Sequence, residues 1–127
     1  YLWIKFGESA VPPKPDRATQ SYLDATFGAG QRMVLEAATT GRTGWLVLGD
    51  EDLCFVSKQG AGFECLTMPY RSITETKINK SLLFDRVMIN SGGRRSMLQI
   101  YRDRRDIGQD FFNRLQLCLG AVRFPAA

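Results

Sequence analysis

Short apolar runs, separated by turns, fill most of the chain between residues 31 and 101. Within several of these runs apolar and polar positions alternate, which is typical of β-strands with one buried face. Gly, Asp, Asn or Pro residues bound the runs, as expected for turns and corners. The pattern predicts seven successive strands, at residues 31–39, 44–48, 53–58, 63–68, 72–80, 84–90 and 96–101.

After the last predicted strand, the spacing of apolar residues changes to that of an α-helix. Apolar residues recur there at steps of three and four, which places them on one face of a helix. The residues of this face are Ile107, Phe111, Leu115, Cys118 and Val122, widened by Phe112 and Leu119. We predict a helix over residues 106–120, capped by Asp106 with Gln109 and ended at Gly120. So short a helix is marginal alone in water, so its apolar face should pack on the strands.

The segment before the strands has a different character. Residues 7–20 contain three of the five prolines and are interpreted as an extended linker, although residues 12–17 also match the PxxP pattern that SH3 domains bind. A short helix is predicted from Ser21, with Asp24 completing its cap and Gly28 ending it. This divides the chain into an N-terminal extension with a short helix (1–30), one domain (31–122) and a tail (123–127).

Composition places the chain among ordinary globular domains. Its 127 residues suit a single core, with 44% hydrophobic and 24% charged residues. No apolar run approaches the roughly 20 residues that span a bilayer. The three cysteines, at positions 54, 65 and 118, lack the spacing of a disulfide framework, and we interpret them as small core residues in a reducing compartment. We therefore expect a cytoplasmic location, with peripheral attachment to the cytosolic face of a membrane.

The residues offer little for catalysis. The chain contains no histidine, and neither a phosphate-binding glycine loop with a following lysine nor a serine nucleophile elbow occurs. The acidic cluster Asp50–Asp52 lacks the later ligand and the spacing of an EF-hand, so we interpret it as a solvated turn. We expect a protein that is not an enzyme, with no catalytic residues, no metal and no cofactor.

The order of seven short antiparallel strands and one closing helix resembles the pleckstrin-homology (PH) superfold, in its GRAM-like or bacterial PH-like branch. The segments that carry the resemblance are GWLVLGDEDLCFVSK (44–58), MPYRSITETKI (68–78) and the strand, charged turn and Phe-Phe helix of residues 98–117. The resemblance implies a mostly β (α+β) fold, a PH-like barrel or sandwich whose open corner is closed by the C-terminal amphipathic helix. In such folds the ligand is usually taken by loops at the opposite end, or along an exposed edge strand and the helix flank.

Basic residues are predicted at that end of the fold, where they would suit an anionic ligand. The net charge is +4, and residues 64–127 carry eleven Lys and Arg against six Asp and Glu. In a meander the first–second, third–fourth and sixth–seventh turns share one end, which would bring together Arg42, Lys58, Arg94 and Arg95. We predict that these four cations face an anion, although solubilising loop charges would look the same. Cations near an anionic membrane are worth about 1 kcal/mol each, so attachment would be weak.

Two functions remain open. The first is an adaptor or scaffold that docks to anionic phospholipid headgroups, to a protein partner, or to both. PH domains that select phosphoinositides carry a basic motif on the first two strands, whereas here Glu36 lies between Arg32 and Arg42, so lipid specificity should be low. The alternative is a protein-interaction or self-assembly domain, a homo-oligomer for instance, in which edge strand 72–80 adds a partner strand and lipids play no part.

Nucleic acid is not a favoured partner. Its binding usually needs a basic stripe with aromatic side chains on which bases stack. The basic cluster at residues 102–105 is interrupted by Asp103 and followed by Asp106, and no aromatic residues are interleaved with it. These mixed charges suggest local pairing instead.

Overall fold

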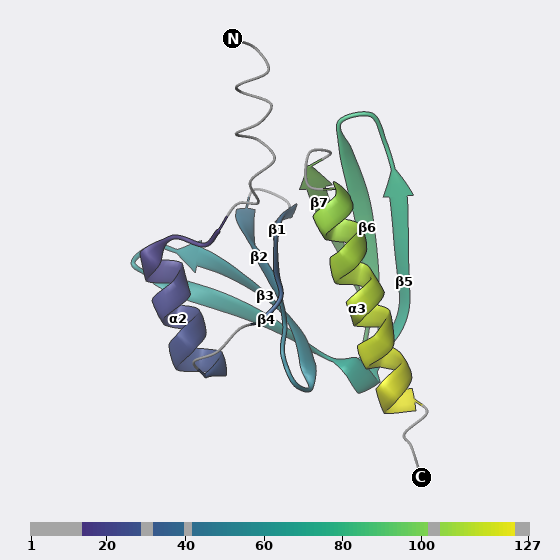
Figure 1. The fold of residues 1–127 in the computed structure, drawn as a ribbon, viewed down its shortest axis with the longest axis horizontal. Coiled ribbons are helices and arrows are strands. Elements are labelled where there is room, and N and C mark those ends of the chain that lie inside the picture. Colours follow the sequence, from purple (N-terminus) through teal and green to yellow (C-terminus); the bar gives the residue numbers. More distant parts are fainter. Residues whose placement is uncertain (1–13, 29–31, 40–41, 102–104, 124–127) are drawn as a thin grey trace.

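The computed structural model describes residues 14–28, 32–39, 42–101 and 105–123. They form an α+β fold of seven antiparallel strands and two α-helices (Figure 1). The helices are α2 (Arg17–Phe27) and α3 (Arg105–Arg123), and a 3₁₀ turn, η1, spans Tyr70–Ser72. The strands are β1 (Val34–Thr39), β2 (Arg42–Leu48), β3 (Asp52–Gln59), β4 (Gly62–Pro69), β5 (Ile73–Lys80), β6 (Phe84–Ser91) and β7 (Arg94–Tyr101).

All seven predicted strands are present, and they belong to one strongly bent sheet. Its strand order is β4-β3-β2-β1-β7-β6-β5, so β4 and β5 are its two edges. No pairing joins these edges among the described residues, so of the predicted barrel or sandwich the α+β fold is confirmed, but the sheet does not close into a barrel. The two halves of the sheet, β1–β4 and β5–β7, meet through β1 and β7, where Ala38 pairs with Gln99 in the described part of the chain.

The β6–β7 hairpin is longer than predicted because its turn is tight. Gly92 and Gly93 have positive φ angles of 57° and 81°, which a two-residue hairpin turn of this kind requires. Pairing therefore continues up to Ser91 opposite Arg94, and β7 starts two residues before the predicted boundary. Arg94 and Arg95 consequently belong to a strand and have fixed positions.

The cap predicted for the short helix is wrong. Helix α2 begins one turn earlier, and its N-cap is Asp16, whose side chain accepts a hydrogen bond of 2.8 Å from the Thr19 N–H. Residues 17–20, predicted as linker, are therefore helical. Gly28 ends the helix with φ 89°, as predicted. The PxxP segment lies partly outside the described residues, which begin at Lys14.

Helix α3 presents the predicted apolar face. Phe111, Phe112, Leu115 and Leu119 are buried, and Ile107, Cys118 and Val122 pack against the same core. Its predicted ends are wrong: Asp106 lies inside the first turn and Gly120 does not stop the helix. Gly120 is not among the glycines with positive φ, so nothing there breaks the helical backbone.

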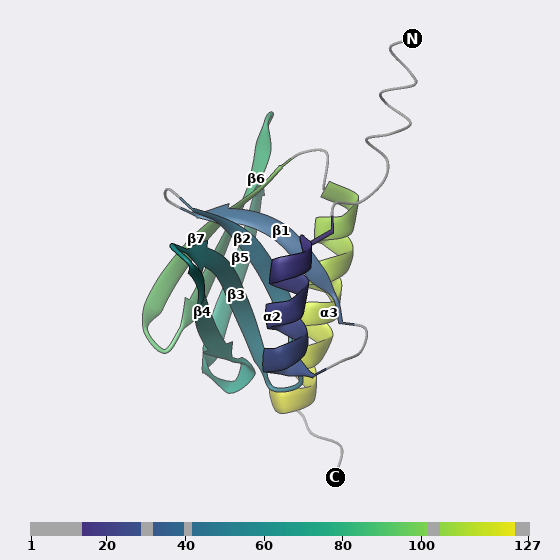
Figure 2. The same ribbon diagram turned by 90° about the vertical axis from the view of Figure 1, so that its left-hand side faces the viewer.

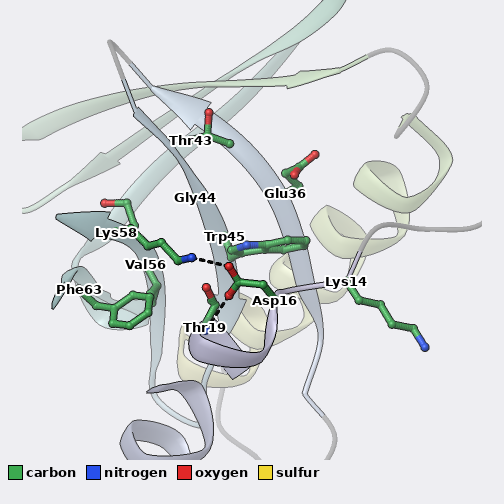
Figure 3. A pocket seen from close by; sticks show the side chains of 11 residues that line it. Lys14, Asp16, Thr19, Glu36, Thr43, Gly44, Trp45, Val56, Lys58 and Phe63 are labelled. Atoms are coloured by element: carbon green, nitrogen blue, oxygen red, sulfur yellow. Dashed lines mark hydrogen bonds and ion pairs between the residues drawn. The ribbon is translucent and has the colours of Figure 1, made fainter. Parts of the chain in front are cut away.

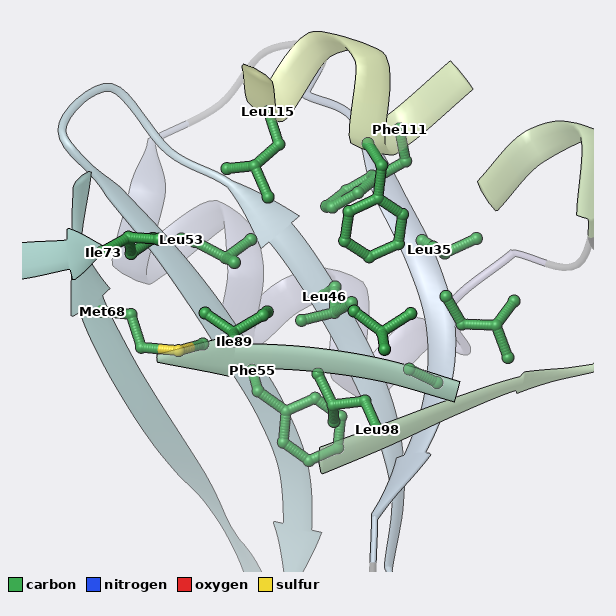
Figure 4. Close-up of a cluster of buried hydrophobic side chains, with 14 of the residues drawn as sticks. Leu35, Leu46, Leu53, Phe55, Met68, Ile73, Ile89, Leu98, Phe111 and Leu115 are labelled. Carbon is green, nitrogen blue, oxygen red and sulfur yellow. The ribbon is translucent and has the colours of Figure 1, made fainter. Parts of the chain in front are cut away.

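The main core fills the inside of the bent sheet and is covered by α3. Figure 4 shows Phe111 and Leu115 of α3 pointing toward Leu35, Leu46 and Leu53 of the sheet. A second cluster lies on the outer face of the sheet under α2, formed by Leu23, Val47, Cys54 and Val56. Strand β3 is therefore buried on both faces, from Leu53 to Ser57.

The N-cap of α2, Asp16, is a carboxylate, so the stability of the protein should depend on pH in the acid range. Asp16 also pairs with Lys58, and this lysine together with Thr19 holds the pKa of the Asp16 carboxyl well below its usual range. A lowered pKa favours folding when the carboxyl is ionised, so this contribution is present above about pH 4 and is lost as the pH falls further. Asp16→Asn keeps a good capping residue but removes the charge.

We expect the wild type to have a higher Tm than Asp16→Asn at pH 7, and the difference to shrink as the pH falls below about 4. Thermal melts of both proteins between pH 7 and pH 2.5 measure it. A difference that stays constant over this range would contradict the role assigned to the charge.

Candidate functional site

The four predicted cations lie on strands that turn back on the side of the sheet away from α3. Arg42 begins β2, Lys58 lies near the end of β3, and Arg94 and Arg95 begin β7. Figure 2 shows the β3–β4 and β6–β7 hairpins turning on the left, while α3 lies on the right. The strand meander therefore brings these cations toward one end of the sheet.

Their electrostatic surroundings divide the four cations into two pairs. Arg42 forms an ion pair with Glu64 at 2.7 Å, and Lys58 pairs with Asp16. Arg94 and Arg95 form no ion pair with any described residue, and both are exposed. The positive charge without a compensating acid at this end is therefore at the start of β7.

No pattern in the sequence predicted the two acidic partners. Glu64 is 22 residues from Arg42, and the two meet only because β2 and β4 flank β3 in the sheet. Asp16 reaches Lys58 only because α2 packs on the outer face of the sheet. Both contacts depend on strand register and helix docking, which residue spacing does not reveal.

An apolar pocket lies between β3–β4 and the first half of β7, beside the end of β1. Its volume is about 330 Å³, at the lower end of the range for small-molecule sites. The core side chains of Phe55, Leu66, Met68 and Leu98 line it, together with Thr39 and residues 95–97. The sequence analysis assigned such residues to the core and did not predict a pocket.

A second pocket, of about 300 Å³, lies between the start of α2 and the outer face of β1–β3 (Figure 3). Trp45 stands at its centre, and Asp16 lies between this ring and Lys58. The lining includes two lysines and two carboxylates, so its charges balance. The dashed contacts in Figure 3 join Asp16 to Lys58 and Thr19, so its best-placed charged groups already bind one another.

The perturbed ionisable groups of the core are poorly suited to catalysis. Burial raises the pKa of the Cys54 thiol to about 12, helped by the neighbouring Cys65, so Cys54 is a thiol at neutral pH and not a nucleophilic thiolate. Burial also raises the pKa of Tyr70, whose hydroxyl donates a 2.7 Å hydrogen bond to the Gly49 carbonyl. These two shifts have structural causes and bring neither group toward neutral pH.

The described residues show no membrane-spanning helix and no cluster of metal ligands. No helix in the described part of the chain is long and apolar enough to cross a bilayer. The described residues also contain no group of three or more Asp, Glu, Cys or His side chains that could hold a metal ion. A comparison with models of known protein families found no match, and neither did a comparison with curated proteins.

Proposed function

We propose that this chain is a non-enzymatic, PH-like module that docks to anionic phospholipid surfaces and acts as an adaptor or scaffold on the cytosolic face of a membrane. The observation that carries the proposal is the exposed pair Arg94 and Arg95, which no described acidic residue neutralises. Two adjacent cations on a rigid hairpin attract an anionic surface without a specific pocket for one headgroup.

The architecture supports the PH-like part of the proposal. A bent antiparallel sheet of order β4-β3-β2-β1-β7-β6-β5, covered by one C-terminal helix, agrees with what the sequence resemblance implied. The helix face is used to cover the core, which leaves the opposite end for a ligand.

The expected affinity is modest. Two cations close to an anionic bilayer contribute about 2 kcal/mol in total, which gives weak and reversible attachment with low lipid specificity. Arg42 and Lys58 add little, because each lies beside an acidic partner that cancels most of its field.

Co-sedimentation with vesicles tests the proposal. We expect binding to phosphatidylcholine vesicles that contain phosphatidylserine, no binding to pure phosphatidylcholine, and weaker binding at high salt. Arg94→Gln with Arg95→Gln should weaken binding about tenfold or more. Arg42→Gln with Glu64→Gln removes an ion pair at constant net charge and should leave binding nearly unchanged. Absence of binding to the anionic vesicles at low salt would refute the proposal.

The position of β5 favours a second candidate, self-assembly through an edge strand. Strand β5 ends the sheet, so one side of its backbone can pair with another chain. Against this, Lys77 and Lys80 are exposed on the same strand, and edge lysines disfavour such pairing. Light scattering across a range of protein concentrations decides: a constant monomer mass would exclude self-assembly.

A further inference from the structure

The outer faces of the two halves of the sheet differ. Helix α2 covers the outer face of the β1–β4 half, where Val47, Cys54 and Val56 are buried beneath it. On β5–β7 the inward residues, such as Val87, Leu98 and Ile100, belong to the core, but no described element covers the opposite face. The outward residues of these three strands therefore form a bare surface, which we call the β5–β7 face.

Strand register sets the composition of this face. Its rows across the three strands are Glu75–Asn90–Arg95, Lys77–Met88–Met97 and Asn79–Arg86–Gln99, followed by Phe84–Tyr101 on β6 and β7. Each strand thus supplies one cation, namely Lys77, Arg86 and Arg95. None of these three cations forms an ion pair with a described residue, and the face has one acid, Glu75, in the row farthest from the β5–β6 turn.

Apolar side chains are concentrated in the same region. Five large hydrophobic residues are exposed among the described residues, and four of them lie on this face or at its end. Leu82 and Leu83, at the β5–β6 turn, are 76% and 73% exposed, while Met97 and Tyr101 are about half exposed. Figure 1 shows the β5–β6 hairpin extending past β7. Exposed apolar residues gathered in this way mark an interaction site more often than scattered ones do.

The β5–β6 turn, which carries Leu82 and Leu83, is fixed at its base by hydrogen bonds, several of them to α3. Arg105 of α3 binds Asp85 through two hydrogen bonds, of 2.7 and 3.1 Å, and donates a third to the Ser81 carbonyl at 3.0 Å. The Ser81 N–H also donates to the Phe84 carbonyl at 3.2 Å and closes the turn. Asp85 is thereby neutralised, so the acid nearest the leucines does not repel an anionic surface.

We infer that the β5–β7 face lies against an anionic bilayer, with Leu82 and Leu83 inserted among the lipid chains. This rests on the proposed function and gives it an orientation: Arg95 is joined by Lys77 and Arg86 on the headgroups. Tyr101 has the amphipathic ring found at membrane interfaces. Cations surrounding projecting leucines match a bilayer, whose surface is anionic and whose interior is apolar.

Two pairs of substitutions with matched controls test this on the full chain. Leu82→Ser with Leu83→Ser, and separately Lys77→Gln with Arg86→Gln, should each weaken binding to phosphatidylserine-containing vesicles about tenfold. Leu117→Ser and Arg114→Gln alter an equally exposed leucine and an exposed arginine on α3, and should bind as the wild type does. All the altered residues are exposed, and unchanged melting curves would verify that each variant folds.

The depth to which the β5–β6 turn enters the bilayer can be measured independently. Leu83→Trp should gain fluorescence that brominated lipids quench, whereas Leu117→Trp should gain fluorescence that they do not quench. Trp3 and Trp45 contribute the same background to both proteins.

The possible outcomes separate this inference from the proposed function. If the wild type binds and only Arg94→Gln with Arg95→Gln weakens binding, the module docks by its β6–β7 turn and the inference is wrong. If the wild type does not bind anionic vesicles, both fail. If the leucine variant instead converts an oligomer into a monomer while vesicle binding is unchanged, the face contacts a second copy of the chain, and the inference is again wrong.

Discussion

Phe111→Ala should lower the free energy of unfolding by about 4 kcal/mol, a large part of the about 5–15 kcal/mol that stabilises a typical domain. Phe111 has no exposed surface and contacts Phe112 edge to face, with ring centroids 5.5 Å apart. It lies where α3 covers the main core, so truncation leaves a cavity between helix and sheet that neither element can easily close.

Urea denaturation measures this cost. Leu117→Ala is the matched control on the same helix, because Leu117 is 74% exposed and its truncation should change stability by less than about 0.5 kcal/mol. A loss below about 1 kcal/mol for Phe111→Ala would mean that α3 is not the main cover of the core.

Gly44→Ala should destabilise the protein by about 3 kcal/mol, although it adds a single methyl group. A Cβ atom at Gly44 would clash with the backbone carbonyl of Val56 and lie 2.9 Å from Cζ of Phe55. The carbonyl belongs to β3, which is buried on both faces, so β2 and β3 cannot separate without disturbing both cores.

The matched control is Gly62→Ala in β4. A Cβ atom there would meet only the Gln59 carbonyl, at 4.0 Å, and Gly62 is not among the glycines with positive φ. We expect its stability to change by less than about 1 kcal/mol, measured by the same denaturation. Equal costs at the two glycines would show that the close approach of β2 to β3 does not explain the effect.

The strands and the apolar face of α3 were predictable because their physical cause is local. Alternation along β6, for instance, places Val87 and Ile89 inside and Arg86 outside, and the helical period places Phe111 and Leu115 together. Helix ends were predicted less well. A cap depends on which of several suitable residues binds the first free N–H groups, and Asp16 did so one turn before Ser21.

The candidate site was predictable only in part, because charges act through their neighbours. The sequence identified Arg42, Lys58, Arg94 and Arg95 as equals, but the fold gives acidic partners to the first two. The β5–β7 face was not foreseen either. Alternation shows that β5–β7 have an outward face, but only tertiary structure shows that α2 covers the other half of the sheet.

The junction between β1 and β7 has a consequence for how the chain folds during synthesis. Each half of the sheet is a set of hairpins whose pairing is local in sequence, whereas β1 and β7, which join the halves, are far apart in the sequence. Helix α3 contacts both β1 and β7 and so spans the junction. Because α3 follows all seven strands in the sequence, the two halves of the sheet should leave the ribosome before the helix that covers their junction. They would become one cooperative unit only when residues up to 123 are available to dock.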